Sequence, residues 1–236
     1  MGFEQLFAIV VFMVAMVLIM SEKVHRTVVA LSGAMLLIIF HVMDFDTAIG
    51  HIDYNTLGVL FGMMLFVAVV RQSGLFEFLA IKTAKIAKGD PWRIMLLFAL
   101  LTAVLSAFLD NVTTVLLMVP VTFSITKILK LDPMPYLLTQ IIASNIGGTA
   151  TLIGDPPNIM IGSAVKELTF VMFIEHLAPI AIVCMAVVLF IMATIYRKSL
   201  VTTPELQAEL MQMDEKAAIT DHALLKRSLF VLGLTI

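Results

Sequence analysis

The distribution of apolar residues along the chain predicts a membrane protein that is built from helices. A helix needs roughly 20 mostly apolar residues to cross a bilayer. Four uninterrupted apolar runs come close to this length: Phe3 to Met20, Thr27 to Val42, Asn55 to Val70, and Pro179 to Tyr196. We expect each run to form a membrane-spanning helix, which gives an all-α polytopic membrane protein.

Two further apolar stretches are interrupted by polar or helix-breaking residues. The first divides at Asp110-Asn111, and the second contains Gly147-Gly148 and then Gly-Asp-Pro-Pro-Asn at 154–158. Irregular backbone at membrane depth is tolerated only where protein or a water-filled cavity satisfies its polar groups. We therefore predict a helical hairpin over 94–130 and a broken helix over 134–165. The pattern also fits two complete spans over 94–130, but the short run from Ile94 to Leu109 favours a re-entrant hairpin.

Two stretches outside these runs carry their own signals. Leu75 to Lys88 has apolar residues on one side and lysines on another, which predicts a basic amphipathic helix at the membrane interface. The alternative is a charged loop. Thr202-Thr203-Pro204-Glu205 is typical of a capping box, so a short helix should follow it.

Composition agrees with a membrane location. Apolar residues make up 61% of the 236 residues and charged residues 14%. A soluble domain of this size cannot bury so much apolar surface. The net charge of -2, without a basic block, argues against a nucleic-acid partner, and the single cysteine excludes a disulfide scaffold.

The positions of lysine and arginine predict the orientation. If the N-terminus lies outside, every Lys and Arg except Lys166 falls in a cytoplasmic segment. The segment 197–228 is then a cytoplasmic linker. The first apolar run lacks a basic segment before it and a small-residue cleavage site, so we expect it to be a retained span.

Asp110 and Asp155 are the only acidic residues that lie within apolar runs away from the loops and the ends of the runs. A carboxylate at membrane depth costs several kcal/mol, so it indicates function. Broken helices with nearby hydroxyls and amides are typical of secondary transporters. The alternative is two polar surface turns in which the aspartates cap helices. The candidate substrate- and ion-binding residues are Asp110, Asn111, Thr113, Thr114, Ser144, Asn145, Gly147, Gly148, Thr149, Gly154, Asp155 and Asn158.

The two motifs identify a family resemblance. Leu109 to Pro120 followed by Ser144 to Asn158 closely resembles the ion transporter superfamily. The branch is that of the arsenite/antimonite permeases, the P protein and one group of Na+/H+ antiporters, with a citrate transporter-like domain. The likeness extends from about Ile52 to Tyr196. It implies an inverted-repeat fold in which a transport domain moves elevator-fashion against a scaffold, with Asp110 at a re-entrant hairpin tip and Asp155 in an unwound helix.

The resemblance also implies a domain organisation, with this chain as the first repeat. Scaffold helices and the interfacial helix occupy 1–93. Half of a transport domain occupies 94–196, including a span over 177–196, and the start of a truncated span occupies 229–236. We expect a second repeat in the full-length chain, a possible homodimer, and a prokaryotic inner membrane as the location. Alone, the chain should bind ions weakly and translocate none.

The chain departs from the dicarboxylate branch of this family at two positions. That branch has hydroxyl residues where Asp110 and Asp155 stand here. Two carboxylates can neutralise or reverse the positive field of half-helix N-termini. We therefore predict H+-coupled export or antiport of a cation or neutral oxyacid, of the Na+/H+ or arsenite type, with both aspartates as proton-coupling residues. The alternative is a Na+-coupled dicarboxylate or citrate-like symporter.

An enzyme interpretation has less support. An intramembrane aspartyl protease needs Gly-x-Gly-Asp, and the matching residues here are Leu152-Ile153-Gly154-Asp155. The five histidines show no metal-ligand spacing. We expect no enzyme activity, no cofactor and no metal other than a transported Na+; the partners are the lipid bilayer and a small ion.

Overall fold

The computed structural model describes residues 2–165 and 167–235, and no strand occurs among them. Lys166, the one basic residue expected outside, falls beyond the described residues. The chain forms two compact units, 1–54 and 55–236. In the first unit, α1 (Phe3–Met20) packs against α2 (Arg26–Ile39), and α3 (Phe45–Gly50) follows. The first predicted span is confirmed, whereas α2 has only 14 residues and ends before Val42.

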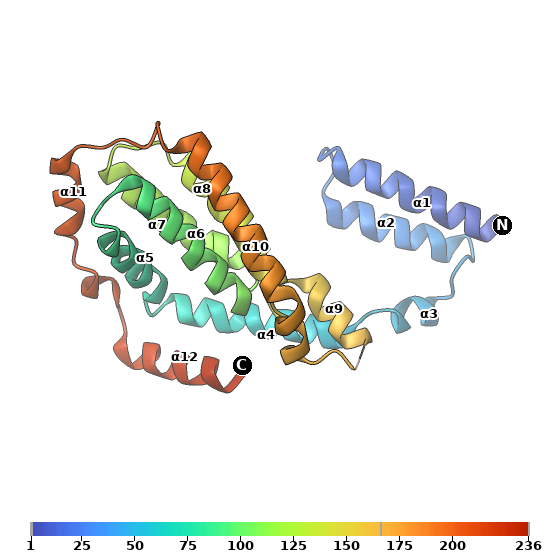
Figure 1. Ribbon diagram of the computed structural model, residues 1–236. Helices are drawn as coiled ribbons and strands as arrows, with labels where there is room; N and C mark the ends of the chain where they lie inside the picture. Colours follow the sequence, from blue (N-terminus) through green and yellow to red (C-terminus); the bar gives the residue numbers. More distant parts are fainter. Residues whose placement is uncertain (1, 166, 236) are drawn as a thin grey trace. The chain divides into compact units, whose positions relative to one another are not determined.

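The second unit holds the remaining helices (Figure 1). In chain order they are α4 (Tyr54–Arg71), α5 (Leu75–Ile86), α6 (Pro91–Phe108), α7 (Asn111–Ile128), α8 (Met134–Thr149), α9 (Pro156–Ala164), α10 (Phe170–Tyr196), α11 (Pro204–Met211), the short 3-10 helix η1 (Lys216–Ala218) and α12 (His222–Thr235). The predicted hairpin and broken helix are both present, as α6–α7 and α8–α9.

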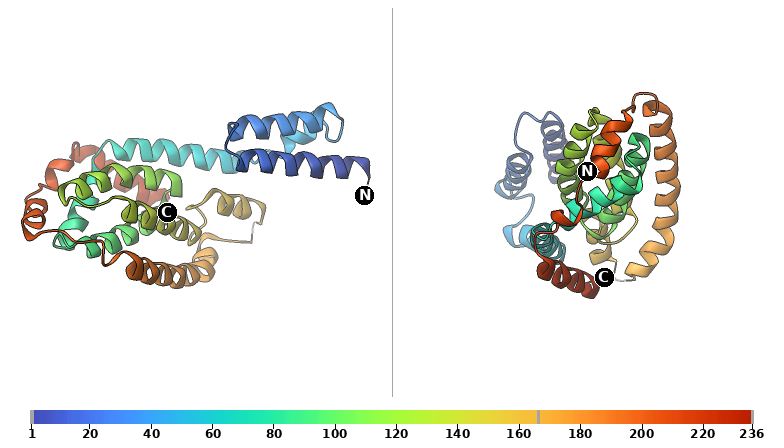
Figure 2. Two further views of the ribbon diagram at one scale, coloured as in Figure 1. Left: turned by 90° about the horizontal axis from the view of Figure 1, so that it is seen from above. Right: turned by 90° about the vertical axis from the view of Figure 1, so that its left-hand side faces the viewer.

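The main core of the second unit is formed by side chains of α5, α6, α7, α8 and α11. Helices α6 and α8 make the most extensive helix contact (Figures 1 and 2). Helices α7 and α10 also pack on α8, and α5 packs on α6 and α7. Ile94, Met95, Phe98, Met118 and Tyr136 are at most 1% exposed. Within the described residues, five helices are long and apolar enough to cross a membrane: α1, α4, α6, α7 and α10. The molecule is therefore an integral membrane protein.

Several boundaries differ from the prediction. Helix α10 begins at Phe170, because Thr169 caps it, and it continues through Pro179 for 27 residues. Helix α6 begins at Pro91 after the cap Asp90 and has 18 residues. The argument from length for a re-entrant hairpin therefore fails, because α6 is long enough to span. Helix α12 begins at His222, ahead of the predicted start at 229.

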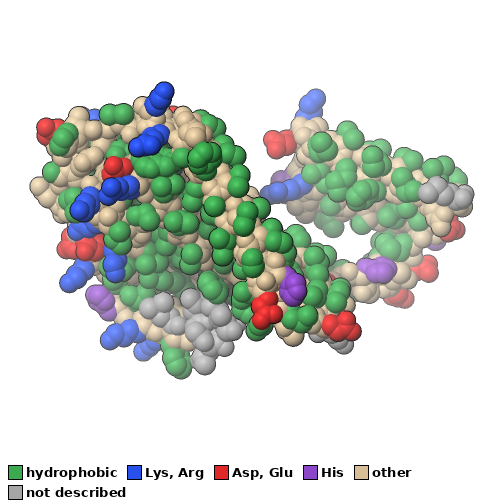
Figure 3. All heavy atoms as spheres, in the orientation of Figure 1, with side chains coloured by type: hydrophobic (Ala, Val, Ile, Leu, Met, Phe, Trp, Pro, Cys, Tyr) green, Lys and Arg blue, Asp and Glu red, His purple; other side chains and the backbone are tan. Residues whose placement is uncertain are grey.

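The segment over Leu75 to Lys88 is helical, so the charged-loop alternative is wrong. Its apolar face packs inward, since Phe76, Ala80 and Ala84 are at most 2% exposed. Helix α5 thus binds α6 and α7 through this face. The apolar face predicted for the membrane interface is a different one and is half-buried or exposed: Leu75, Phe78, Leu79 and Ile86. Lys and Arg side chains gather over the α5 and α11 end of this unit, whereas acidic and histidine side chains lie near the start of α10 (Figure 3).

Helix α11 forms at the predicted place, and Pro204 is its first residue. The capping box itself is absent, because the Thr203 side chain accepts no hydrogen bond from the first turn. Thr202 instead donates its hydroxyl to the carbonyl oxygen of Leu129, 2.9 Å away. The segment is therefore fastened to the C-terminal end of α7.

Candidate functional site

The tip of the α6–α7 hairpin is organised by Asp110. This residue has an extended backbone (φ -68, ψ 149) and is the N-cap of α7. Its Oδ1 accepts a hydrogen bond from the Thr113 backbone N–H at 2.9 Å. An aspartate at an N-cap satisfies one of the free N–H groups of the first turn and interacts favourably with the helix dipole. One carboxylate oxygen of Asp110, Oδ1, therefore has a structural role as the cap of α7.

The other oxygen of Asp110 has no such partner. Oδ2 is buried and forms no hydrogen bond within the described part of the chain. The hydroxyl of Thr114, one turn further along α7 on a fully buried side chain, likewise has none. A buried polar atom without a partner costs about 1–3 kcal/mol, and more when it is charged. The start of α7 therefore holds a carboxylate oxygen that can accept a proton and, with the Thr114 hydroxyl, two oxygens that can bind a cation or water.

Asn111 joins the hairpin tip to the broken helix. Its Nδ2 donates to Asp155 Oδ1 at 3.3 Å and to Asn145 Oδ1 at 3.1 Å. Its carbonyl oxygen accepts from Ser144 Oγ at 2.8 Å. Both amide hydrogens of Asn111 are thus used, one towards α8 and one towards the start of α9. The arrangement connects residues that are 34 and 44 positions apart in the chain.

Glycines allow α8 to approach α6 and the unwound segment. A Cβ at Gly147 would lie 2.1 Å from the carbonyl oxygen of Ala103. A Cβ at Gly154 would lie 2.6 Å from the carbonyl oxygens of Gly148 and Ser106. Real Cβ atoms do not come so close to backbone, so only glycine fits at these positions. These glycines serve packing, and the ligand-binding groups around them come from other residues.

The segment between α8 and α9 is held open by side chains that replace helical hydrogen bonds. Asn158 Nδ2 donates to the carbonyl oxygens of Thr151 at 2.9 Å and Gly148 at 3.2 Å. Thr151 donates its hydroxyl to the carbonyl oxygen of Ala107 and accepts from the Gly154 N–H. Backbone groups freed by a helix break need such partners at membrane depth. The break is therefore a built feature of the fold.

Two helix N-termini meet at this break. Asp155 is the N-cap of α9, and its side chain accepts no capping hydrogen bond. Asn111 is the first residue of α7, and its amide binds Asp155. Asp110 directly precedes Asn111 in the chain, so both carboxylates lie at this break. Two positive helix ends and two carboxylates thus share one site.

A cavity of about 250 Å³ opens beside the site. Asn111, Ser144 and Asn145 supply its polar groups. Val112, Val115, Leu116 and Ile141 supply its apolar wall. A small ligand in this cavity would touch the same asparagine that binds Asp155.

Comparison with known proteins identifies the family of this chain. The model of a family described as a citrate transporter matches residues 16–236. The chain belongs to the citrate transporter family. The match includes α4–α12 and hence the whole of the site.

Individual relatives agree with the family. A 46 kDa membrane protein of Mycobacterium leprae is 42% identical over 222 residues, which are 92% of this chain and 52% of that protein. An uncharacterised transporter of Mycobacterium tuberculosis is 41% identical over 92% of this chain and 51% of its own length. The human P protein is 44% identical over 151 residues, 62% of this chain and 18% of that protein. The chain spans about half the length of these mycobacterial relatives, and none of these three relatives indicates an enzyme.

Most of the candidate residues of this family member meet in space, and two do not contribute a side chain to the site. Hydrogen bonds connect Asn111 with Ser144, Asn145 and Asp155. Asp110 directly precedes Asn111, and Asn158 holds the unwound segment that leads to Asp155. Thr149 is exposed and donates its hydroxyl to Ile146 in its own helix. Thr113 contributes its backbone N–H.

Ser106 belongs to the site of this transporter family member but was not among the candidates. It is fully buried, and its hydroxyl donates to the Ser144 carbonyl oxygen at 2.7 Å. It therefore fixes the turn of α8 that supplies Ser144 and Asn145. Its one sequence signal is a hydroxyl four positions before Asp110 in an otherwise apolar run.

Proposed function

We propose that the chain carries the first half of the transport site of an H+-coupled secondary transporter. The observation that carries this proposal is the bridge by which Asn111 joins Asp155 to Asn145 beside the half-buried Asp110. In this arrangement the Asn111 side chain both binds the Asp155 carboxylate and lines the ligand cavity. Loading of a proton and loading of a substrate can therefore influence each other.

The charges of the site favour a proton or a cation. Each helix N-terminus presents about half a positive charge, so α7 and α9 together supply about one. Two ionised carboxylates exceed this by about one negative charge. One proton or one monovalent cation would balance the site. The partnerless Asp110 Oδ2 is the atom best placed to receive it, with Asp155 as the second coupling carboxylate.

The substrate that fits this balance is a cation or a neutral oxyacid. Transport of the Na+/H+ or arsenite type would exchange the substrate for protons that leave the carboxylates. The cavity beside Asn111 is small, and its polar groups are uncharged amides and one hydroxyl. Such groups bind Na+ or a neutral oxyacid without a strong preference for negative charge.

A citrate-like anion is the second candidate, because the family model that matches 16–236 is described as a citrate transporter. Helix N-termini bind carboxylates well. An anion would enter this site only with cations or protons that neutralise Asp110 and Asp155. Symport with Na+ would satisfy this condition.

The movement that we propose follows from the two broken elements. We propose that the hairpin tip and the unwound segment hold their polar groups at membrane depth, as a re-entrant hairpin and a broken helix would in an elevator-type inverted repeat. The second repeat, contributed by the remainder of a full-length chain, would supply the other half of the site. Basic residues at the α5 and α11 end agree with an N-terminus outside, a cytoplasmic linker and a prokaryotic inner membrane.

Flux in proteoliposomes tests the proposal. The full-length transporter would be reconstituted and supplied with radiolabelled Na+, arsenite, antimonite or citrate, with and without a pH gradient. We expect flux of Na+ or of an oxyacid that rises with the pH gradient and disappears when a protonophore is added. Citrate uptake driven by a Na+ gradient, unchanged by the protonophore, would support the second candidate and reject the first.

A further inference from the structure

The segment between α10 and α12 lies along α5 and is not a free linker. We call residues 200–220 the strap. Its Leu200 and Leu210 are 7% and 1% exposed, and they belong to the same core as Ala84, Leu129 and Tyr136. Helix α11 of the strap contacts both α5 and α7. The strap is therefore packed against the base of the hairpin.

Both ends of α5 are shaped to receive the strap. Gly74, just before α5, has φ +77, and a Cβ there would lie 1.8 Å from the Ala218 carbonyl oxygen. Gly89, just after α5, has φ +71, and a Cβ there would lie 3.0 Å from the Gln207 Cβ. Positive φ already favours glycine at each position. The close approach of the strap adds a second, independent requirement for glycine at Gly74.

Two threonines of the strap satisfy the ends of other helices. Thr202 donates to the carbonyl oxygen of Leu129 at the end of α7. Thr220 donates its hydroxyl to the carbonyl oxygen of Gln72 at 2.5 Å and its N–H to that of Ser73 at 3.1 Å, just after α4. Carbonyl groups at helix C-termini lack partners within the helix. The strap supplies these partners at both of its ends.

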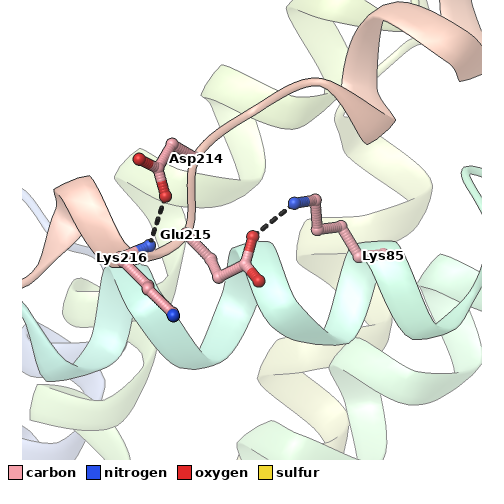
Figure 4. A network of polar contacts seen from close by, with 4 residues as sticks. All are labelled: Lys85, Asp214, Glu215 and Lys216. Atoms are coloured by element: carbon pink, nitrogen blue, oxygen red, sulfur yellow. Dashed lines mark hydrogen bonds and ion pairs between the residues drawn. The ribbon is translucent and has the colours of Figure 1, made fainter.

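Charged residues fasten the middle of the strap (Figure 4). The Lys85 ammonium group of α5 hydrogen-bonds and forms an ion pair with the Glu215 carboxylate. Asp214 accepts from the Lys216 N–H at 2.9 Å, which fixes the turn that presents Glu215. Contacts of four kinds therefore hold the strap on α5: apolar burial, glycine packing, helix-end hydrogen bonds and one ion pair.

We infer that the strap is a clasp that makes α5 and the base of the α6–α7 hairpin a single rigid body during transport. The inference rests on the proposed function only for the claim that the hairpin moves. Helix α5 follows α4 directly in the chain, through Gln72 to Gly74. Without the clasp, only the direct packing of α5 on α6 and α7 would join this helix to the hairpin. With the clasp, motion of α5 is passed to the hairpin tip that carries Asp110.

Crosslinking tests the clasp. In a Cys184→Ser background of the full-length transporter, the double variant Lys85→Cys and Glu215→Cys would be joined by a short thiol-reactive crosslinker. We expect the crosslinked protein to retain flux within twofold of the uncrosslinked protein, because the two sites do not separate. Loss of flux by tenfold or more on crosslinking would overturn the inference, because the strap would then have to leave α5 in each cycle.

Loosening the strap gives the complementary test. Thr220→Val keeps the side-chain size and removes the bond to Gln72, and Gly74→Ala forces the strap away from α5. We expect at least a threefold loss of flux in Thr220→Val and a greater loss in Gly74→Ala. Thr194→Val, which removes a hydroxyl bond inside α10, is the matched control and should keep its flux. Unchanged flux in the folded Thr220→Val and Gly74→Ala proteins would overturn the inference.

The two proposals fail in different ways. Absence of pH-dependent flux in the unaltered transporter rejects the proposed function. Whether the strap stays bound to α5 can still be measured by the crosslinking yield and by limited proteolysis of the strap, because neither assay needs a substrate. Rapid cleavage between 211 and 217 in the unaltered transporter would reject the clasp alone.

Discussion

The side chain of Asn111 donates one hydrogen bond to Asp155, with 3.3 Å between Nδ2 and Oδ1. These residues lie at the starts of two different helices, α7 and α9. The second amide hydrogen of Asn111 binds Asn145, which lines the neighbouring cavity. The contact thus connects the carboxylate of the broken helix with the surface that a ligand would meet.

Removal of the Asn111 side chain should break the connection between the Asp155 carboxylate and the ligand cavity. In Asn111→Ala, two hydrogen bonds are lost and Asp155 Oδ1 loses its donor; a hydrogen bond of this kind contributes about 0.5–1.5 kcal/mol. We expect substrate flux to fall at least tenfold. In Asn145→Ala, the bond between Asn111 and Asp155 remains, so the loss should be smaller. A larger defect in Asn145→Ala than in Asn111→Ala would contradict this order; flux measurements on both variants decide it.

Asp110→Asn tests proton coupling with little disturbance of the fold. Asparagine caps helices about as well as aspartate, so α7 should keep its N-cap. The charge at Oδ2 is lost, and we expect flux to become independent of the pH gradient. Asp90→Asn is the matched control, because Asp90 caps α6 in the same way through the Arg93 N–H at 3.0 Å. Equal pH dependence in Asp110→Asn and Asp90→Asn would show that Asp110 has only a capping role.

Gly147→Ala tests the close contact between α6 and α8. The new methyl group would lie 2.1 Å from the Ala103 carbonyl oxygen, and overpacking of this kind costs about 1–3 kcal/mol or more. We expect a lower midpoint of thermal unfolding in detergent and a lower yield of folded protein. In the control Gly58→Ala, the methyl group enters open space within α4, and alanine favours the helix. A stable Gly147→Ala protein would contradict the close approach of α8 to the Ala103 backbone.

The ion pair of the strap should respond to acid. The hydrogen bond from Lys85 lowers the pKa of Glu215 below its ordinary value. A carboxylate with a lowered pKa in the folded state stabilises that state above the ordinary pKa, and the effect is lost as the pH falls. Hydrogen exchange at 212–220, corrected for its intrinsic pH dependence, should therefore stay slow at neutral pH and accelerate below about pH 4. Glu215→Gln should lack this acid step; an identical step in Glu215→Gln would assign it to another group.

The motifs predicted the parts of the site that are local in sequence. The cap at Asp110, the break at 154–158 and the start of α9 at Pro156 follow from residues a few positions apart, so their chemistry is visible in the sequence. Ser106 and the outward orientation of Thr149 depend on how α6 packs against α8, which a single sequence does not reveal. The start of α10 at Phe170 was missed because Glu175 and His176 interrupt the apolar run ahead of Pro179.

The strap shows the same division between local and long-range information. The helix after Thr203 was predicted from its own residues. The strap packs against α5 through contacts between residues far apart in the chain: Gly74 with Ala218, and Gln72 with Thr220. Gly74 and Gly89 are its only signals in the sequence, and they are weak signals because glycine is common in turns that pack against nothing.

Proton movement during transport tests the central claim most directly. Proteoliposomes that contain the full-length transporter and an internal pH-sensitive dye would receive the substrate identified by the flux panel. We predict that entry of substrate moves protons in a fixed ratio, that Asp90→Asn preserves this ratio, and that Asp110→Asn abolishes proton movement. Substrate flux without any movement of protons in the unaltered transporter would contradict the account.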